Sequence, residues 1–164
     1  MRKVDFEPIR LTEMADIFAI RIDNDQYTEF SKFLVMFKNT DNAFLKDDFE
    51  RIIAAIEKIA ENGALESFFR PEGGINDRVC AIPLLIKPRD KKKEATLRLY
   101  CIRVSDRLLI LGGGGRKTTD AYDEDAFLAQ QVKTLQSIDS SLLTLENNGI
   151  SIENEIYNIT LDID

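Results

Sequence analysis

The sequence contains no histidine and no tryptophan, and it has only two cysteines. Without histidine the chain has no Ser-His-Asp or Cys-His catalytic set, and a conventional zinc site lacks one of its usual ligands. Cys80 and Cys101 each lie within an apolar, strand-like run. A small buried thiol is the ordinary explanation for such a residue, and a reducing compartment disfavours a disulfide. We therefore expect two buried thiols and no metal.

Long apolar runs are missing as well. No uninterrupted stretch approaches the roughly 18 residues of a membrane helix. Asp5 and Glu7 stand where a signal peptide would be apolar. These absences predict a cytoplasmic protein that has no contact with a membrane. A length of 164 residues suits a single domain over residues 1–164.

Charge is plentiful, but its two signs are segregated along the chain. Charged residues make up 31% of the sequence, and the net charge is −7. Residues 70–117 hold twelve basic and five acidic residues, a local charge of +7, whereas the rest of the chain carries −14. After Lys117 a single base, Lys133, stands against ten acids. This pattern predicts a basic working face with acidic flanks.

The spacing of apolar residues predicts an α+β fold. It indicates a helical hairpin over roughly residues 27–37 and 47–62 and a long helix from near Asp123 to Asn148. Extended runs predict strands at 17–22, 65–69, 79–86, 97–104 and 108–111. We expect an N-terminal strand and the helical hairpin to pack on a mostly antiparallel β-sheet. The long C-terminal helix and a short terminal strand follow.

Local signals refine these elements. Asp47 and Glu50 form a capping-box pair that predicts the start of the second helix. Pro83 predicts that its strand is an edge strand or carries a bulge, and Ser105-Asp106 predicts the turn of a β-hairpin. The tail at 150–164 is an acidic extension whose isoleucines alternate between residues 150 and 160. Either it forms a strand that shields the basic sheet, or it is a solubilising tail.

A run of four glycines, Gly112 to Gly115, precedes Arg116 and Lys117. The spacing fits neither a P-loop nor a dinucleotide-binding fingerprint, so no cofactor is expected. One interpretation is a strand exit where side chains would clash. The other is that the bare backbone of Gly113 and Gly114 lets a phosphate chain approach closely, with Arg116 and Lys117 as its counter-charges.

Arg98 and Tyr100 are the second candidate feature. Strand alternation puts them on one face, together with Ile102 and Val104. A strand arginine between leucines requires a solvated face or a paired charge. The functional alternative is a guanidinium that stabilises a pentavalent phosphate, aided by a tyrosine hydroxyl.

The order strand, helix, helix, antiparallel strands, helix resembles the RelE/ParE superfamily of bacterial toxins, which belong to type II toxin–antitoxin pairs. The segment from Leu97-Arg98-Leu99-Tyr100 through Arg116-Lys117-Thr118-Thr119 is most similar to the phage-derived HigB-like branch. There, a strand arginine pairs with a strand that exits through a glycine into a basic motif followed by a helix. The resemblance covers roughly residues 16 to 140. The chain departs from it in lacking histidine and in carrying a glycine run where an aromatic residue is common.

The resemblance implies a metal-independent endoribonuclease that acts on ribosome-bound mRNA and is held by a cognate antitoxin protein. Arg98 matches the central-strand arginine, and Arg116 and Lys117 match the basic exit motif. Arg70 would be a further phosphate contact, and Tyr100 is a candidate for proton transfer. Two alternatives remain open at this point. One is a non-catalytic interaction protein on the same fold, such as a ParE-like poison of a protein target or an inactive domesticated toxin. The other is a small-molecule enzyme that uses the glycine loop.

Overall fold

The computed structural model describes residues 1–69, 78–84, 96–117 and 122–164, with the side chains of residues 122–125 left aside. In chain order the elements are β1 Arg2–Leu11, β2 Asp16–Ile22, α1 Glu29–Phe37, α2 Ala43–Asn62, the 3-10 turn η1 Glu66–Phe68, β3 Val79–Ala81, β4 Thr96–Ser105, β5 Leu108–Lys117, α3 Tyr122–Asn147, α4 Ile152–Glu155, the 3-10 turn η2 Ile156–Asn158 and β6 Leu161–Ile163.

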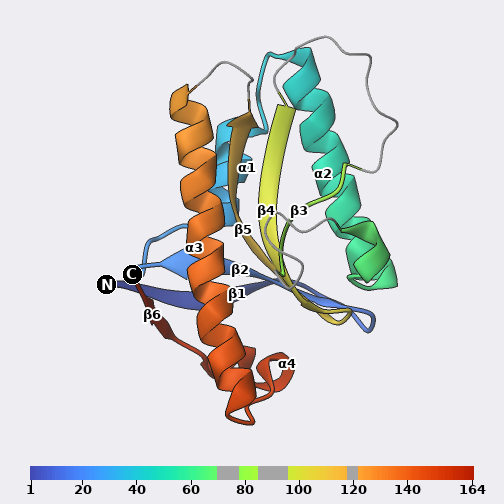
Figure 1. Ribbon diagram of the computed structural model, residues 1–164. Coiled ribbons are helices and arrows are strands. Elements are labelled where there is room, and N and C mark those ends of the chain that lie inside the picture. Colours follow the sequence, from blue (N-terminus) through green and yellow to red (C-terminus); the bar gives the residue numbers. More distant parts are fainter. Residues whose placement is uncertain (70–77, 85–95, 118–121) are drawn as a thin grey trace.

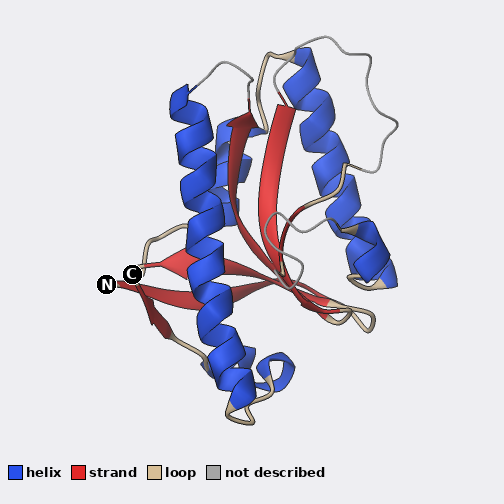
Figure 2. Ribbon diagram, in the orientation of Figure 1, coloured by secondary structure: helices blue, strands red, loops and turns tan. Residues whose placement is uncertain are grey.

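The six strands form one sheet in the order β3-β4-β5-β2-β1-β6 (Figure 1). Neighbouring strands are antiparallel, except that β2 and β5 run parallel. Long helix α3 crosses one face of the sheet, and α1 and α2 lie against the other (Figure 2). The α+β class, the helical hairpin, the long C-terminal helix and the short terminal strand are therefore confirmed.

Alternation along β4 divides the core between the two faces. Leu97, Leu99 and Cys101 belong to the apolar cluster beneath α1 and α2, whereas Tyr100 and Ile102 belong to the cluster beneath α3. Such strict alternation is expected of a strand buried on both sides by helices. It follows that Arg98 lies on the α3 face with Tyr100, as the sequence predicted.

The expected β-hairpin of β4 and β5 is present, but its turn lies at Asp106-Arg107, one residue later than predicted. Strand β5 also continues through all four glycines instead of ending before them. A bulge accommodates the run, because Leu99 pairs with Gly114 whereas Cys101 pairs with Leu111. The glycines are thus part of the sheet and not a strand exit.

Helix α2 starts earlier than the capping-box pattern predicted. The side chain of Asn42 caps the helix by accepting hydrogen bonds from the backbone N–H groups of Phe44 and Leu45. Asp47 instead forms an ion pair with Arg51 one turn later. The neighbouring Asp48 is fully buried and accepts a 3.0 Å hydrogen bond from the backbone N–H of Leu97. This carboxylate ties α2 to the beginning of β4.

Several strand predictions were wrong in their extent. Strand β1 was not predicted, and the 3-10 turn η1 Glu66–Phe68 takes the place of the strand expected at 65–69. The run at 79–86 shortens to Val79–Ala81, with Ile82 donating one more backbone hydrogen bond to Leu99. Residues 85 and 86 lie outside the described part. Strand β3 does lie at the edge of the sheet, as Pro83 predicted.

The C-terminal part follows the sequence as far as Gly149, whose φ of 87° ends the long helix. The alternating strand expected at 150–160 is instead the short helix α4 and the turn η2, which bury Ile152 and Ile156. Strand β6 comes later and pairs with β1. Within the ranges described, no helix has the length and apolar character needed to cross a membrane.

Candidate nucleic-acid interface

The candidate cations meet where β4 begins and β5 ends. The hairpin end consists of Thr96 to Arg98 of β4 and Gly115 to Lys117 of β5, with Arg98 paired to Gly115, Leu97 to Arg116 and Thr96 to Lys117. Directly opposed residues of an antiparallel pair point to the same side of the sheet. Arg98 and Lys117 therefore share the α3 face. Arg116 lies on the opposite face with Leu97, so only two of the three cations share a side.

Most other arginines in the described part of the chain form ion pairs with carboxylates, and these three cations do not. Arg21, Arg78 and Arg103 all form ion pairs with carboxylates. Arg98 is partly exposed, and its guanidinium makes a 3.3 Å hydrogen bond to the carbonyl oxygen of its neighbour Leu97. Among the residues described, no carboxylate lies within ion-pairing distance of Arg98, Arg116 or Lys117. Within the described ranges, the positive charge of the hairpin end is thus not neutralised by a carboxylate.

Tyr100 does not share this exposure. It is 5% exposed and packs in the apolar cluster beneath α3 with Ile102 and Leu128. A phenol that exchanges protons with a substrate must reach that substrate directly or through one water. In this conformation the body of α3 covers the ring.

The glycine run is buried beneath the same helix. A Cβ on Gly112 would lie 2.8 Å from the side chain of Leu135, and one on Gly113 would lie 2.3 Å from the Oε1 atom of Gln131. A Cβ on Gly114 would approach the carbonyl oxygen of Arg98 to 2.0 Å. The missing side chain of Gly113 thus makes room for α3, and that of Gly114 makes room for the backbone of β4. Their backbone is not open in the way that the phosphate interpretation requires.

Phe127, an exposed aromatic residue beside the hairpin end, was not among the residues predicted for the site. Its side chain is 46% exposed, and two of its ring carbons lie 3.4 Å from the position that a Cβ on Gly115 would take. A signal was available, because Phe127 immediately precedes Leu128, the first residue of the helix's apolar stripe. A neighbour in the helix is turned by about 100°, so a large aromatic side chain there falls outside the stripe.

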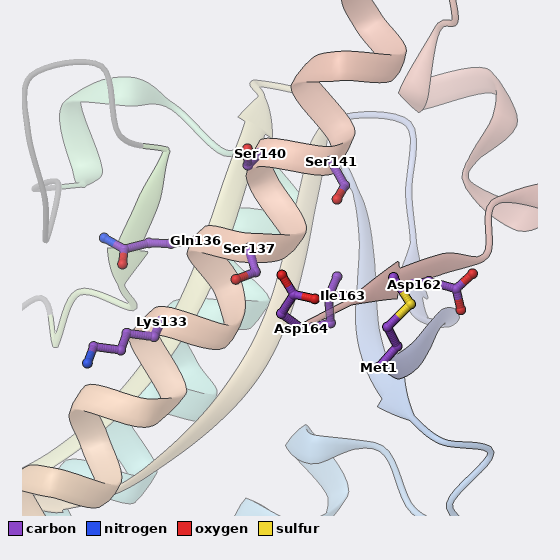
Figure 3. A pocket seen from close by; sticks show the side chains of 9 residues that line it. All are labelled: Met1, Lys133, Gln136, Ser137, Ser140, Ser141, Asp162, Ile163 and Asp164. Carbon is purple, nitrogen blue, oxygen red and sulfur yellow. The ribbon is translucent and has the colours of Figure 1, made fainter.

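A polar concavity of about 590 Å³ lies away from the hairpin end, between α3 and β6 (Figure 3). Ser137 and Asp164 are turned toward this gap in Figure 3, and Lys133 and Gln136 also line it. The carboxylates of Asp162 and Asp164 border it as well. Two acids against a single lysine disfavour a polyanion at this position.

The remaining expected site residue, Arg70, lies outside the described residues. Over the part of the chain that the structure describes, no group of three or more cysteine, aspartate or glutamate residues is arranged to hold a metal ion. Both cysteines are buried, as predicted, and they oppose each other on β3 and β4. No protein-family model, curated protein or solved structure matches this chain.

Proposed function

We propose that this chain is a toxin-like RNA-binding protein that contacts RNA phosphates at the hairpin end. The observation that carries the proposal is that the cations there lack carboxylate partners among the described residues. Arg98, Arg116 and Lys117 have no carboxylate partner among the described residues, although the chain carries more acids than bases. Neutralising phosphates with such side chains supplies most of the affinity of a protein for nucleic acid.

The order of elements also supports the proposal. From β2 to α3 the chain runs strand, helix, helix, three antiparallel strands, helix, with Arg98 on an interior strand. This is the order that the resemblance to RelE/ParE toxins implies. A cognate antitoxin as protein partner and ribosome-bound mRNA as target accordingly belong to the proposal.

Metal-independent cleavage of the bound RNA is the second candidate function. The guanidinium of Arg98, which has no carboxylate partner among the described residues, favours it, because such a group can stabilise the charge that develops on a phosphoryl oxygen. The burial of Tyr100 weighs against it, since the chain has no histidine to move the proton instead. Binding without cleavage therefore stands first.

The first prediction tests the binding site with Arg98→Ala. Fluorescence anisotropy with a labelled single-stranded RNA should give a Kd about tenfold higher than that of the native protein. The slope of log Kd against log salt should fall by about one, because one phosphate contact is lost. Arg10→Ala is the matched control. Arg10 is exposed, forms an ion pair with Glu57 and lies on β1, which β5 and β2 separate from β4 in the sheet. Its removal should change neither the Kd nor the salt slope.

The proposal fails if the native protein binds no RNA at low salt, or if Arg10→Ala weakens binding as much as Arg98→Ala. Thermal unfolding of Arg98→Ala separates the site from the fold, since replacing a partly exposed side chain that has no ion pair with a described residue should leave Tm within a few degrees. Incubation of the same RNA with protein and EDTA tests cleavage. Products that appear with the native protein and vanish with Arg98→Ala would place cleavage first.

A further inference from the structure

Phe127 is the more exposed of two large apolar side chains that the described part of α3 leaves open, the other being Leu143. The buried side of α3 carries Leu128, Leu135, Ile138 and Leu142, all less than 5% exposed. Phe127 lies beside this stripe and keeps 46% of its surface open. A single exposed apolar side chain is common and by itself needs no function. The position of Phe127 beside the cations of the hairpin end is what indicates a function.

The ring of Phe127 lies against the hairpin end itself. Its Cδ2 and Cε2 atoms are both 3.4 Å from the position that a Cβ on Gly115 would take. Gly115 is the register partner of Arg98. Because Gly115 has no side chain, the aromatic ring lies directly over the strand on the face that carries the guanidinium of Arg98.

Positive charge lies on both sides of this position. Arg98 is across the strand pair from Gly115, and Lys117 is two residues further along β5, on the same face. Two residues of strand span about 6.6 Å. The half-exposed ring thus packs on Gly115, and the backbone positions of two cations without described carboxylate partners lie within about 7 Å of that glycine. The acids of residues 123–125 precede Phe127 in the sequence, and their side chains lie outside the described part.

We infer that Phe127 is a base-stacking platform and that the RNA bound at the hairpin end is single-stranded. This inference rests on the function proposed above. Proteins that bind single strands combine cations for the backbone with aromatic rings on which bases stack. In a duplex the faces of the bases are covered by their neighbours, so an aromatic ring gains nothing from an intact double helix.

The second prediction concerns Phe127→Leu, which keeps an apolar side chain against Gly115 but removes the ring. Anisotropy with a labelled ten-nucleotide RNA should give a Kd raised at least about fivefold, since one base loses its stacking partner. The salt slope should stay unchanged, because no phosphate contact is lost. Phe127→Tyr should restore the affinity. Tyr27→Leu removes a comparably exposed ring elsewhere and should bind like the native protein.

A second measurement uses the lack of tryptophan in the chain. The variant Phe127→Trp carries a single indole at the proposed platform, and a stacked base should quench its fluorescence as RNA is added. Tyr27→Trp is the matched control, and its fluorescence should not respond. This readout reports stacking even where Phe127→Leu alters the packing of α3.

The outcomes separate this inference from the function on which it rests. If the native protein binds single-stranded RNA but Phe127→Leu binds equally well, or Phe127→Trp is not quenched, the platform is wrong and the phosphate site remains. Equal affinity for a duplex of the same sequence also overturns the single-strand preference. If the native protein binds no RNA, both proposals fail together.

Discussion

At the scale of single residues, the glycine run shows how one pattern can carry two interpretations that sequence cannot separate. Gly112 and Gly113 make room for Leu135 and Gln131 of α3, while Gly114 makes room for the backbone of Arg98. These partners lie at least fifteen residues away along the chain. No local property of the run indicates which groups approach it. By contrast, strand alternation placed Arg98 and Tyr100 on one face correctly, because that property is local.

The third prediction compares two substitutions within the run. Gly114→Ala should lower the free energy of unfolding by about 2–3 kcal/mol, because its Cβ would meet a backbone oxygen that cannot rotate away. Gly115→Ala should cost less than about 1 kcal/mol, since its nearest neighbours are side-chain atoms of Leu128 and Phe127 at 3.3–3.4 Å. Urea unfolding with a common slope measures both. Equal losses would mean that close strand approach does not explain the glycine at 114.

At the scale of elements, predictions succeeded where the signal lies within one segment. The apolar stripe of α3 and strand β4 were predicted nearly to their ends, whereas β5 runs six residues beyond the predicted 108–111 because the glycine run pairs with β4. Strand β1 was missed because Arg2–Leu11 carries only Val4 and Phe6 as buried apolar residues and is held by pairing with β2 and β6. Its Pro8 is tolerated beside a bulge and beyond the reach of β6. Tertiary pairing outweighed local propensity here.

Edge strand β3 has little pairing of its own, and α3 holds it through an ion-pair cluster. Arg78, just before β3, donates from Nε to Asp139 at 2.8 Å and from Nη1 to Glu146 at 2.9 Å. Burial disfavours the charge on Arg78, but the two carboxylates outweigh that effect and raise its pKa. Asp139 is itself only 5% exposed. The cluster therefore fastens the edge of the sheet to the helix that crosses it.

The fourth prediction is that Arg78→Ala destabilises the protein by about 2–4 kcal/mol, because it leaves the buried carboxylate of Asp139 without this cation. Arg10→Ala removes an ion pair whose partners are both about half exposed, and its effect on the free energy of unfolding should be far smaller because solvent screens such a pair. Thermal or urea unfolding of the two variants side by side gives the comparison. Similar small losses in both would show that the cluster does not hold β3.

At the scale of the whole molecule, the charge segregation read from the sequence becomes a separation in space. The C-terminal acids Glu155, Asp162 and Asp164 are exposed on α4 and around β6. In the sheet order, β6 is four strand spacings from β4, or about 19 Å at the usual distance between strands. Since charges are screened over roughly 8–10 Å at physiological salt, an acidic shield for the hairpin end is not expected from this arrangement.

Deletion of residues 150–164 cannot test that shield. It would remove Ile152, Ile156 and Ile163 from the core beneath α3 together with the charges. Neutralisation keeps the fold and changes only the field. The fifth prediction is therefore that a combined Glu155→Gln, Asp162→Asn and Asp164→Asn variant binds single-stranded RNA within about twofold of the native protein at 0.15 M salt, because its charges lie beyond the screening length.

Glu29→Gln provides the matched positive control for this neutralisation. The Cβ of Glu29 is 3.6 Å from the position that a Cβ on Gly113 would take, so this acid lies within a screening length of the hairpin end. Removing one negative charge there should tighten RNA binding by about two- to threefold at low salt. If the triple C-terminal variant instead gains more affinity than Glu29→Gln, then the tail acts on the basic face over a distance that screening should not permit. The acidic extension would in that case regulate RNA binding and not merely keep the protein in solution.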